Sequence, residues 1–218
     1  DFSYHAAPGN MKLMVLNFID EASKFHVAKL IKAEKCNKFT DLGNCSSVEL
    51  IEAFQEYIRY LPTPRILHVD DEAVYASDEF KEYCNLHNMF LKTCAGEAHF
   101  QNGIVERHIG TLKTICQKLW MEDVFADTDP DYVLDKACEA KNTYALHNGV
   151  SPIQWFHGQK SNPLVQSEEI PPSLTAGSEF EKHMQRRTAA ASAFHYAEAR
   201  TMLRLAMHAR STVSYTHL

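Results

Sequence analysis

The chain has 218 residues, of which 45% are hydrophobic and 23% charged, and its formal net charge is −6. This length and apolar content allow one sizeable domain with a buried core. The negative charge argues against a strongly basic nucleic-acid binder, because phosphate affinity comes from Lys and Arg, although their clustering matters more than the total.

Two further properties limit the class of protein. The six cysteines form no Cys-x-x-Cys pair, and no secretory signal precedes them, which favours reduced thiols in an intracellular protein. No apolar run reaches the length of a transmembrane helix, so no membrane partner is expected.

The beginning of the chain predicts strands. Residues 1–6 are expected to be the end of a first strand, and 8–10, Pro-Gly-Asn, a turn. The apolar run 12–19 and the alternating run 24–31 predict a pair of strands joined by a hairpin.

Helices and strands then alternate. A serine-capped amphipathic helix is expected over 46–60, followed by a buried strand over 65–70. A helix over 77–87 and a short strand over 88–93 come next. This order predicts a mixed α/β sheet flanked by helices.

The second half of the chain predicts mainly helices. An amphipathic helix is expected to begin at Glu106, and another runs over 131–146. Four prolines make 151–176 irregular, and 179–210 predicts a long helical extension. The last residues, 211–218, resemble translated sequencing-adapter sequence and are expected to carry no function.

Two acids stand in informative places. Asp70 ends the strand expected to be buried, and 35 residues separate it from Glu106, which is expected near the apolar face of its helix. A carboxylate close to a core is costly unless it is paired or binds a metal. A strand end and a facing helix can share a divalent cation, with Asp1 as a third ligand.

The residues around these acids resemble the catalytic cores of retroviral and long-terminal-repeat retrotransposon integrases. The matching segments are His68-Val69-Asp70, the stretch 97–113, the Gly-Val-Ser-Pro corner at 149–152 and Phe-His-Gly at 156–158. The resemblance covers about residues 1–165. It implies a ribonuclease-H-like fold with a mixed five-stranded sheet, followed by a linker over 166–178 and the helical extension.

The resemblance also implies a site and a reaction. Asp1, Asp70 and Glu106 would be the catalytic acids and hold two Mg²⁺ ions, which Mn²⁺ can replace, about 3.5–4 Å apart. The reaction would be DNA 3′-end processing followed by strand transfer into target DNA. Asp20 competes with Asp1 for the place of the first acid.

The same resemblance points to residues that bind DNA. Arg107 and Lys113 would contact phosphates of the retroelement ends. Gln101 and Asn102 are expected in a loop before the helix, near the scissile phosphate, and the competing reading makes Asn102 a simple helix cap. His68 is expected to be a buried, hydrogen-bonded histidine rather than a ligand. Expected partners are retroelement and target DNA and further copies of the chain, in the nucleus.

The chain departs from the family pattern after its second acid. Asp71-Glu72 stands where the family usually has Asn-Gly, and these charges should raise the pKa of neighbouring carboxylates. The chain also starts at the first acid, which suggests that the first strand is cut. An alternative is therefore a decayed or domesticated module that binds DNA or itself without catalysis. A third reading is a ribonuclease-H-type nuclease of the same fold.

Overall fold

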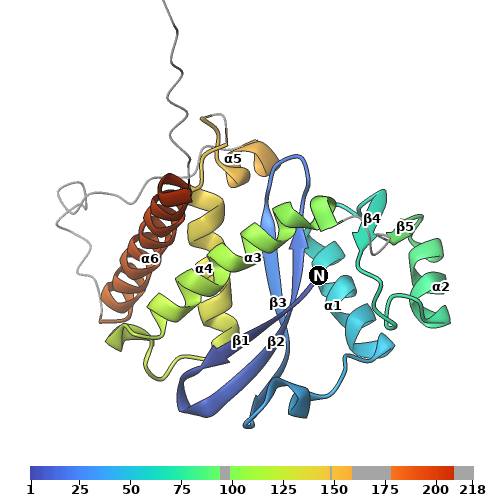
Figure 1. The fold of residues 1–218 in the computed structure, drawn as a ribbon, viewed down its shortest axis with the longest axis horizontal. Coiled ribbons are helices and arrows are strands. Elements are labelled where there is room, and N and C mark those ends of the chain that lie inside the picture. The colour runs from blue at the N-terminus through green and yellow to red at the C-terminus, as the bar shows by residue number, and fades with distance from the viewer. Residues whose placement is uncertain (94–98, 148, 159–177, 209–218) are drawn as a thin grey trace, which may run out of the picture.

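The computed structural model describes residues 1–93, 99–147, 149–158 and 178–208 (Figure 1). In this part of the chain, two small β-sheets and the helices around them form a mixed α/β fold. None of the described helices is both long enough and apolar enough to cross a membrane.

The first sheet is an antiparallel meander of β1 (Phe2–Ala7), β2 (Met11–Ile19) and β3 (His26–Lys35), in the order β1-β2-β3. The expected turn at 8–10 is confirmed, with Gly9 at φ +69°. Gly9 allows this left-handed backbone without the clash that a side chain would cause. The third strand runs four residues beyond its predicted end.

The second sheet pairs β4 (Ile66–Val69) with β5 (Phe90–Thr93) in parallel. Helix α2 (Asp78–Leu86) connects them, and α1 (Ser47–Tyr60) precedes β4. Ser46 caps α1 and forms a capping box with Glu49, as the sequence predicts. A short 3₁₀ turn, η2 (Phe39–Leu42), follows β3.

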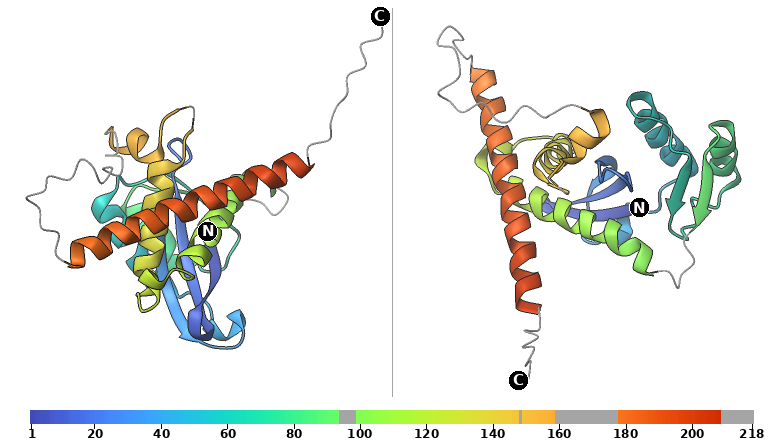
Figure 2. Two further views of the ribbon diagram at one scale, coloured as in Figure 1. Left: turned by 90° about the vertical axis from the view of Figure 1, so that its left-hand side faces the viewer. Right: turned by 90° about the horizontal axis from the view of Figure 1, so that it is seen from above.

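The remaining helices are α3 (His99–Leu119), α4 (Pro130–Tyr144), α5 (Pro152–His157) and α6 (Ser178–His208), with the 3₁₀ turn η3 (Asp123–Phe125). Figure 2 shows α6 crossing α3 and α4 on the far side of these helices from the second sheet. Helix α5 lies in a stretch that was expected to be irregular. It forms there because Ser151 caps it and Pro152 fits its first position. Residues 159–177 and 209–218 lie outside the described part, so the predictions for the linker and tail stay open.

Two hydrophobic clusters lie on opposite faces of the first sheet. Leu13 and Val15 on β2 face the cluster formed with α3, α4 and α6. Leu16 and Phe18 on the same strand face a cluster formed with α1, α2 and β4. The first sheet is therefore the central layer of the fold.

The expectation of one five-stranded sheet is wrong for the described residues, which form sheets of three and two strands. A cleft lined by residues of β2 and β4 lies between the two sheets, so they do not pair with each other. Strand β4 is also less buried than expected, since Ile66 is 55% exposed and only Val69 is buried. His68 is exposed, contrary to the prediction of a buried histidine, because one flank of β4 borders an open cleft.

Candidate functional site

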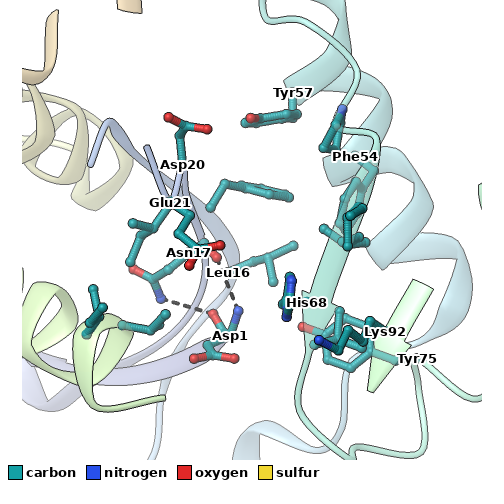
Figure 3. A pocket seen from close by; sticks show the side chains of 18 residues that line it. Asp1, Leu16, Asn17, Asp20, Glu21, Phe54, Tyr57, His68, Tyr75 and Lys92 are labelled. Atoms are coloured by element: carbon teal, nitrogen blue, oxygen red, sulfur yellow. Dashed lines mark hydrogen bonds between the residues drawn. The ribbon is translucent and has the colours of Figure 1, made fainter. Parts of the chain in front are cut away.

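A cleft of about 610 Å³ separates the first sheet from β4. Apolar side chains of β2, α1 and β4 form most of its walls, and polar side chains such as Asp1, Asp20 and Lys92 lie around it (Figure 3). The polar residues lining it are Asp1, Asn17, Asp20, Glu21, Tyr57, His68, Tyr75 and Lys92. Concave sites that combine apolar walls with a few polar groups are the usual places for ligands and chemistry.

Asp1 lies at the start of β1 and lines this cleft, half-buried. The Asn17 backbone N–H donates to the Asp1 carbonyl oxygen at 2.8 Å, and the Asp1 amino group donates to the Asn17 carbonyl at 3.1 Å. The buried residues Ser3 and His5 alternate with exposed residues along β1, so their side chains lie on the same face of the strand as that of Asp1. Strand β1 packs against α3.

Asp70 and Glu72 approach Asp1 from the other wall. Asp70 follows Val69, which lines the cleft, and it is half-buried. Burial lowers the pKa of the Asp1 amino group, while the charges of Asp70 and Glu72 raise it. The pKa of Glu72 is itself raised, first by partial desolvation, with Asp70 adding to the effect against the opposing Asp1 amino group. The expected influence of the extra acids on neighbouring carboxylates is therefore present at Glu72.

Glu106 lies on α3 beside the same cleft but points to solvent. Ile104 and Val105 line the cleft, whereas Glu106 shares an exposed stripe of the helix with Gly110 and Gln117. The prediction that Glu106 opens its helix and lies near the buried face is wrong, because α3 begins at His99, seven residues earlier. Glu106 therefore lies seven residues inside the helix, with its side chain exposed to solvent.

Of the three predicted acids, only Asp1 lines the cleft, while Asp70 and Glu106 each follow a residue that lines it, and the three do not form a complete metal site. The described residues contain no group of three His, Cys, Asp or Glu side chains arranged to hold a metal ion. Carboxylate oxygens are the hard ligands that Mg²⁺ prefers, so the donor chemistry fits this ion. The structure thus brings Asp1 and Asp70 to facing walls and leaves Glu106 on the adjoining helix.

Asp20, the competitor for the first acid, has a local structural role. Its carboxylate accepts hydrogen bonds from the Ser23 N–H at 2.7 Å and the Ser23 hydroxyl at 2.6 Å. These bonds hold the turn between β2 and β3, where Lys24 has φ +62°. Asp20 also lines the cleft, but the turn already accounts for its carboxylate.

The predicted DNA-binding residues all lie on α3. Arg107 is exposed, and its Nε donates to the Gly103 carbonyl at 3.0 Å. Lys113 is half-buried beside His5, and desolvation lowers its pKa. Gln101 and Asn102 belong to the helix itself, so a loop there and a cap at Asn102 are both wrong; their side chains lie outside the described part.

Sequence reasoning missed a set of buried polar residues beside the cleft. Asn17, His26 and Lys141 are each at most 4% exposed and hydrogen-bonded to one another in a chain. His26 falls in the alternating pattern of β3, and this pattern could have marked it as inward-facing. Lys141 gives no such signal, because lysine is almost never fully buried.

Searches against protein-family models and curated proteins found no match. Solved structures do match. The simian T-cell lymphotropic virus intasome in complex with PP2A regulatory subunit B56 gamma aligns with a TM-score of 0.60 and 21% identity over 78% of this chain. The match spans 57% of the intasome chain, so this chain covers little more than half of that length.

Isolated integrase cores are similar over nearly their whole length. The HTLV-2 integrase catalytic core domain in complex with magnesium, in its dimeric form, gives a TM-score of 0.56 and 21% identity over 72% of this chain and 92% of that chain. The BIV integrase catalytic core domain gives a TM-score of 0.54 and 14% identity, over 72% of this chain and 91% of that chain. The chain therefore has the fold of a retroviral integrase catalytic core.

Proposed function

We propose that this chain is the catalytic core of a retroelement integrase, which trims DNA 3′ ends and joins them to target DNA. The observation that carries the proposal is that Asp1 lines the cleft and Asp70 and Glu106 directly follow the lining residues Val69 and Val105, in an integrase-core fold. The spacing of Asp70 and Glu106 in the sequence supports the same assignment.

The three acids would hold the catalytic cations, which we propose to be two Mg²⁺ ions or Mn²⁺ in their place. When bound, such ions lower the pKa of an attacking water or 3′-hydroxyl and stabilise the leaving oxygen. The HTLV-2 core was solved in complex with magnesium, which supports this choice of ion. Asp1 is supplied by β1, Asp70 by the end of β4 and Glu106 by α3.

Residues of α3 would hold the DNA. Arg107 is exposed one position after Glu106, and its guanidinium suits a phosphate oxygen. Lys113 lies two turns further along the helix and is partly desolvated, which strengthens its attraction for a phosphate. Gln101 and Asn102, at the other end of the helix, complete the proposed DNA contacts.

Self-association and a nuclear location belong to the same proposal. HTLV-2 integrase cores were solved in dimeric and trimeric forms, and the simian virus protein in an intasome. We propose a homodimer or higher oligomer that acts on chromosomal DNA in the nucleus.

The test is metal-dependent strand joining, and its reversal, on a labelled branched DNA. Asp1→Asn, Asp70→Asn and Glu106→Gln should each lower the rate at least about 100-fold, because each removes a charged ligand of the proposed cations. Asp127→Asn and Glu82→Gln are matched controls, since both acids are exposed and lie outside the cleft lining. The controls should keep the parent rate.

If the Glu106→Gln variant joined DNA strands at the parent rate, the assignment of Glu106 as the third catalytic acid would be wrong. Cleavage of RNA in an RNA–DNA hybrid without joining would move the chain to the ribonuclease-H-type nucleases instead.

A specific observation favours one second candidate, a non-catalytic module derived from an integrase. The described acids form no metal-holding group, and Asp71-Glu72 adds negative charge beside Asp70. A folded parent that binds DNA but neither joins it nor gains thermal stability from Mn²⁺ would favour this candidate.

A further inference from the structure

A chain of buried polar side chains crosses the first sheet. Lys141 on α4 places its Nζ 2.7 Å from Nδ1 of His26 on β3. His26 Nε2 lies 3.0 Å from Oδ1 of Asn17 on β2. All three side chains are buried, so each depends on these contacts to satisfy its polar atoms.

The hydrogen bonds of Asn17 determine which atom donates and which accepts in each bond between these side chains. Its Nδ2 donates to the Ser3 hydroxyl at 2.8 Å and to the Asp1 carbonyl at 3.2 Å. Its Oδ1 must then accept from His26 Nε2–H, so His26 Nδ1 carries no proton and accepts from Lys141. Burial, the nearby Lys141 and the more distant charges lower the pKa of His26 well below its usual value, which keeps this neutral tautomer.

The chain continues along β1 toward α3. The Ser3 hydroxyl accepts from Asn17 and is also hydrogen-bonded to His5 Nε2, 2.9 Å away. His5 Nδ1 is a buried atom with no hydrogen-bond partner in the described part of the chain. The polar chain therefore runs from α4 across β3 and β2 to the face of β1 that also bears Asp1.

Apolar side chains at these positions would have avoided the desolvation of several polar groups. The advantage of hydrogen bonds between specific atoms is that they fix the register of β1 against β2. Slipping β1 by one residue along β2 would break the Asn17 bonds and turn the Asp1 side chain to the opposite face of the sheet. Buried polar groups are best attested as devices that specify register in this way.

We propose that Lys141, His26 and Asn17 are positioning residues that hold Asp1 in the cleft through this hydrogen-bonded chain. The inference rests on the proposed function, because it gives Asp1 a part in the reaction. Asn17 contacts Asp1 directly, whereas His26 and Lys141 act only through Asn17.

The test uses the double variant His26→Leu/Lys141→Met, in which neither changed residue contacts Asp1. A triple variant with Asn17→Leu as well removes the third of the proposed positioning side chains, so that no unpaired polar atom is left among these three positions, while Ser3 and His5 keep the bond between them. Lys136→Met is the matched control, since it removes a lysine from the same helix that pairs with Glu139 instead. Amide hydrogen exchange in the metal-free chain and steady-state strand joining are measured for each.

The backbone amide at position 17, which donates to Asp1, should exchange about tenfold faster or more in the double and triple variants, while other β2 amides keep their protection. The joining kcat should fall about 10- to 100-fold with KM for DNA within about twofold, because misplacing a catalytic group by about 1 Å has such effects. Lys136→Met should match the parent in both measurements.

Unchanged exchange of the backbone amide at position 17 in the triple variant would overturn the inference, whatever the activity. Faster exchange with an unchanged kcat would also overturn it, since Asp1 would then need no positioning. An inactive parent would overturn both the proposed function and the catalytic purpose of these hydrogen-bonded side chains. The exchange data alone would then decide whether the hydrogen bonds hold β1 in place.

Discussion

The two halves of the molecule solve the problem of burying a core in different ways. The packed half, β1–β3 with α3, α4 and α6, closes its cluster with aliphatic side chains and with three alanines of α6, Ala190, Ala193 and Ala197. Such small residues let helices approach closely. The open half, α1, β4, α2 and β5, relies on aromatic contacts such as Phe54–Phe80 and leaves a cleft beside β4.

The proposed acids lie where the two halves meet. Asp1 and Glu106 come from the packed half, and Asp70 comes from the end of β4 in the open half. The packed half therefore sets two of the three acids, while the position of β4 against β1 sets the third. Assembly of the proposed metal site is a question of how the open half docks on the packed half.

The largest effect that separates the halves should come from truncating a core residue of α3. Leu112 is fully buried in the packed half, whereas Ile66 on β4 is 55% exposed. Leu112→Ala should lower the free energy of unfolding by about 2–5 kcal/mol, because it leaves a cavity. Ile66→Ala should cost less than about 1 kcal/mol. Urea unfolding followed by circular dichroism measures both, and equal losses would show that the halves are packed alike.

The packed half should also make stability depend on pH above neutrality. Burial lowers the pKa of Lys141 to about 7 from 10.5, so between these values the unfolded chain binds the extra proton. The free energy of unfolding therefore rises with pH across this window, by at most about 1.4 kcal/mol per pH unit.

Lys141→Met should remove this rise. Urea midpoints at pH 7 and 9 would then differ less in the variant than in the parent. The exposed Lys81 on α2, in the open half, gives the control variant Lys81→Met, which should keep the parent slope. A parent without any slope would show that Lys141 keeps its ordinary pKa.

A smaller effect of the same sign is expected in acid. Burial lowers the pKa of His108 to about 3, with Lys141 and His147 contributing. Below the usual histidine pKa of 6.5 the unfolded chain takes up a proton that the folded chain refuses, so stability falls as the pH falls toward 3. His108→Leu should reduce the loss between pH 6.5 and 5.5 by about 1 kcal/mol, measured as the change in urea midpoint. A loss as steep as that of the parent would point to other groups.

The sequence predicted most helices and strands of both halves but not the exposure of β4, for a physical reason. Apolar spacing located the strand pair and the helices, and Ser46 and Ser77 marked two helix starts by their capping bonds. The same reasoning predicted that β4 is buried, because most of its residues are apolar. Burial depends on what covers a strand, and the exposed flank of Ile66 and His68 follows from the cleft rather than from local sequence.

The candidate site shows the same limit. The spacing and neighbours of Asp70 and Glu106 pointed to one site, and in the fold each directly follows a residue that lines the cleft. Sequence could not tell which way Glu106 points, because its position borders both the buried and the exposed faces of the helix. It also gave no reason to connect Lys141 with Asn17, since their link through His26 depends on how α4 packs across the sheet.

The smallest expected effect comes from the ion pairs that join the two halves. Lys29 on β3 lies 2.9 Å from Glu56 on α1 and 3.7 Å from Asp131 on α4. Partly exposed pairs contribute about 0.2–1 kcal/mol each, and salt screens them. Lys29→Met should therefore lower the free energy of unfolding by about 1 kcal/mol or less, with the difference shrinking in 1 M NaCl.

A double-mutant cycle of Lys29→Met with Glu56→Gln isolates the contact between the halves, because Asp131 belongs to the packed half alone. Glu52→Gln on the same helix is its control, since Glu52 has no ion pair among the described contacts. A coupling energy near zero would mean that apolar contacts of β2 with α1, rather than charge, hold the open half in place. A coupling that persists in high salt would instead make Lys29 a fixed link, and the docking of β4 beside Asp1 would then depend on it.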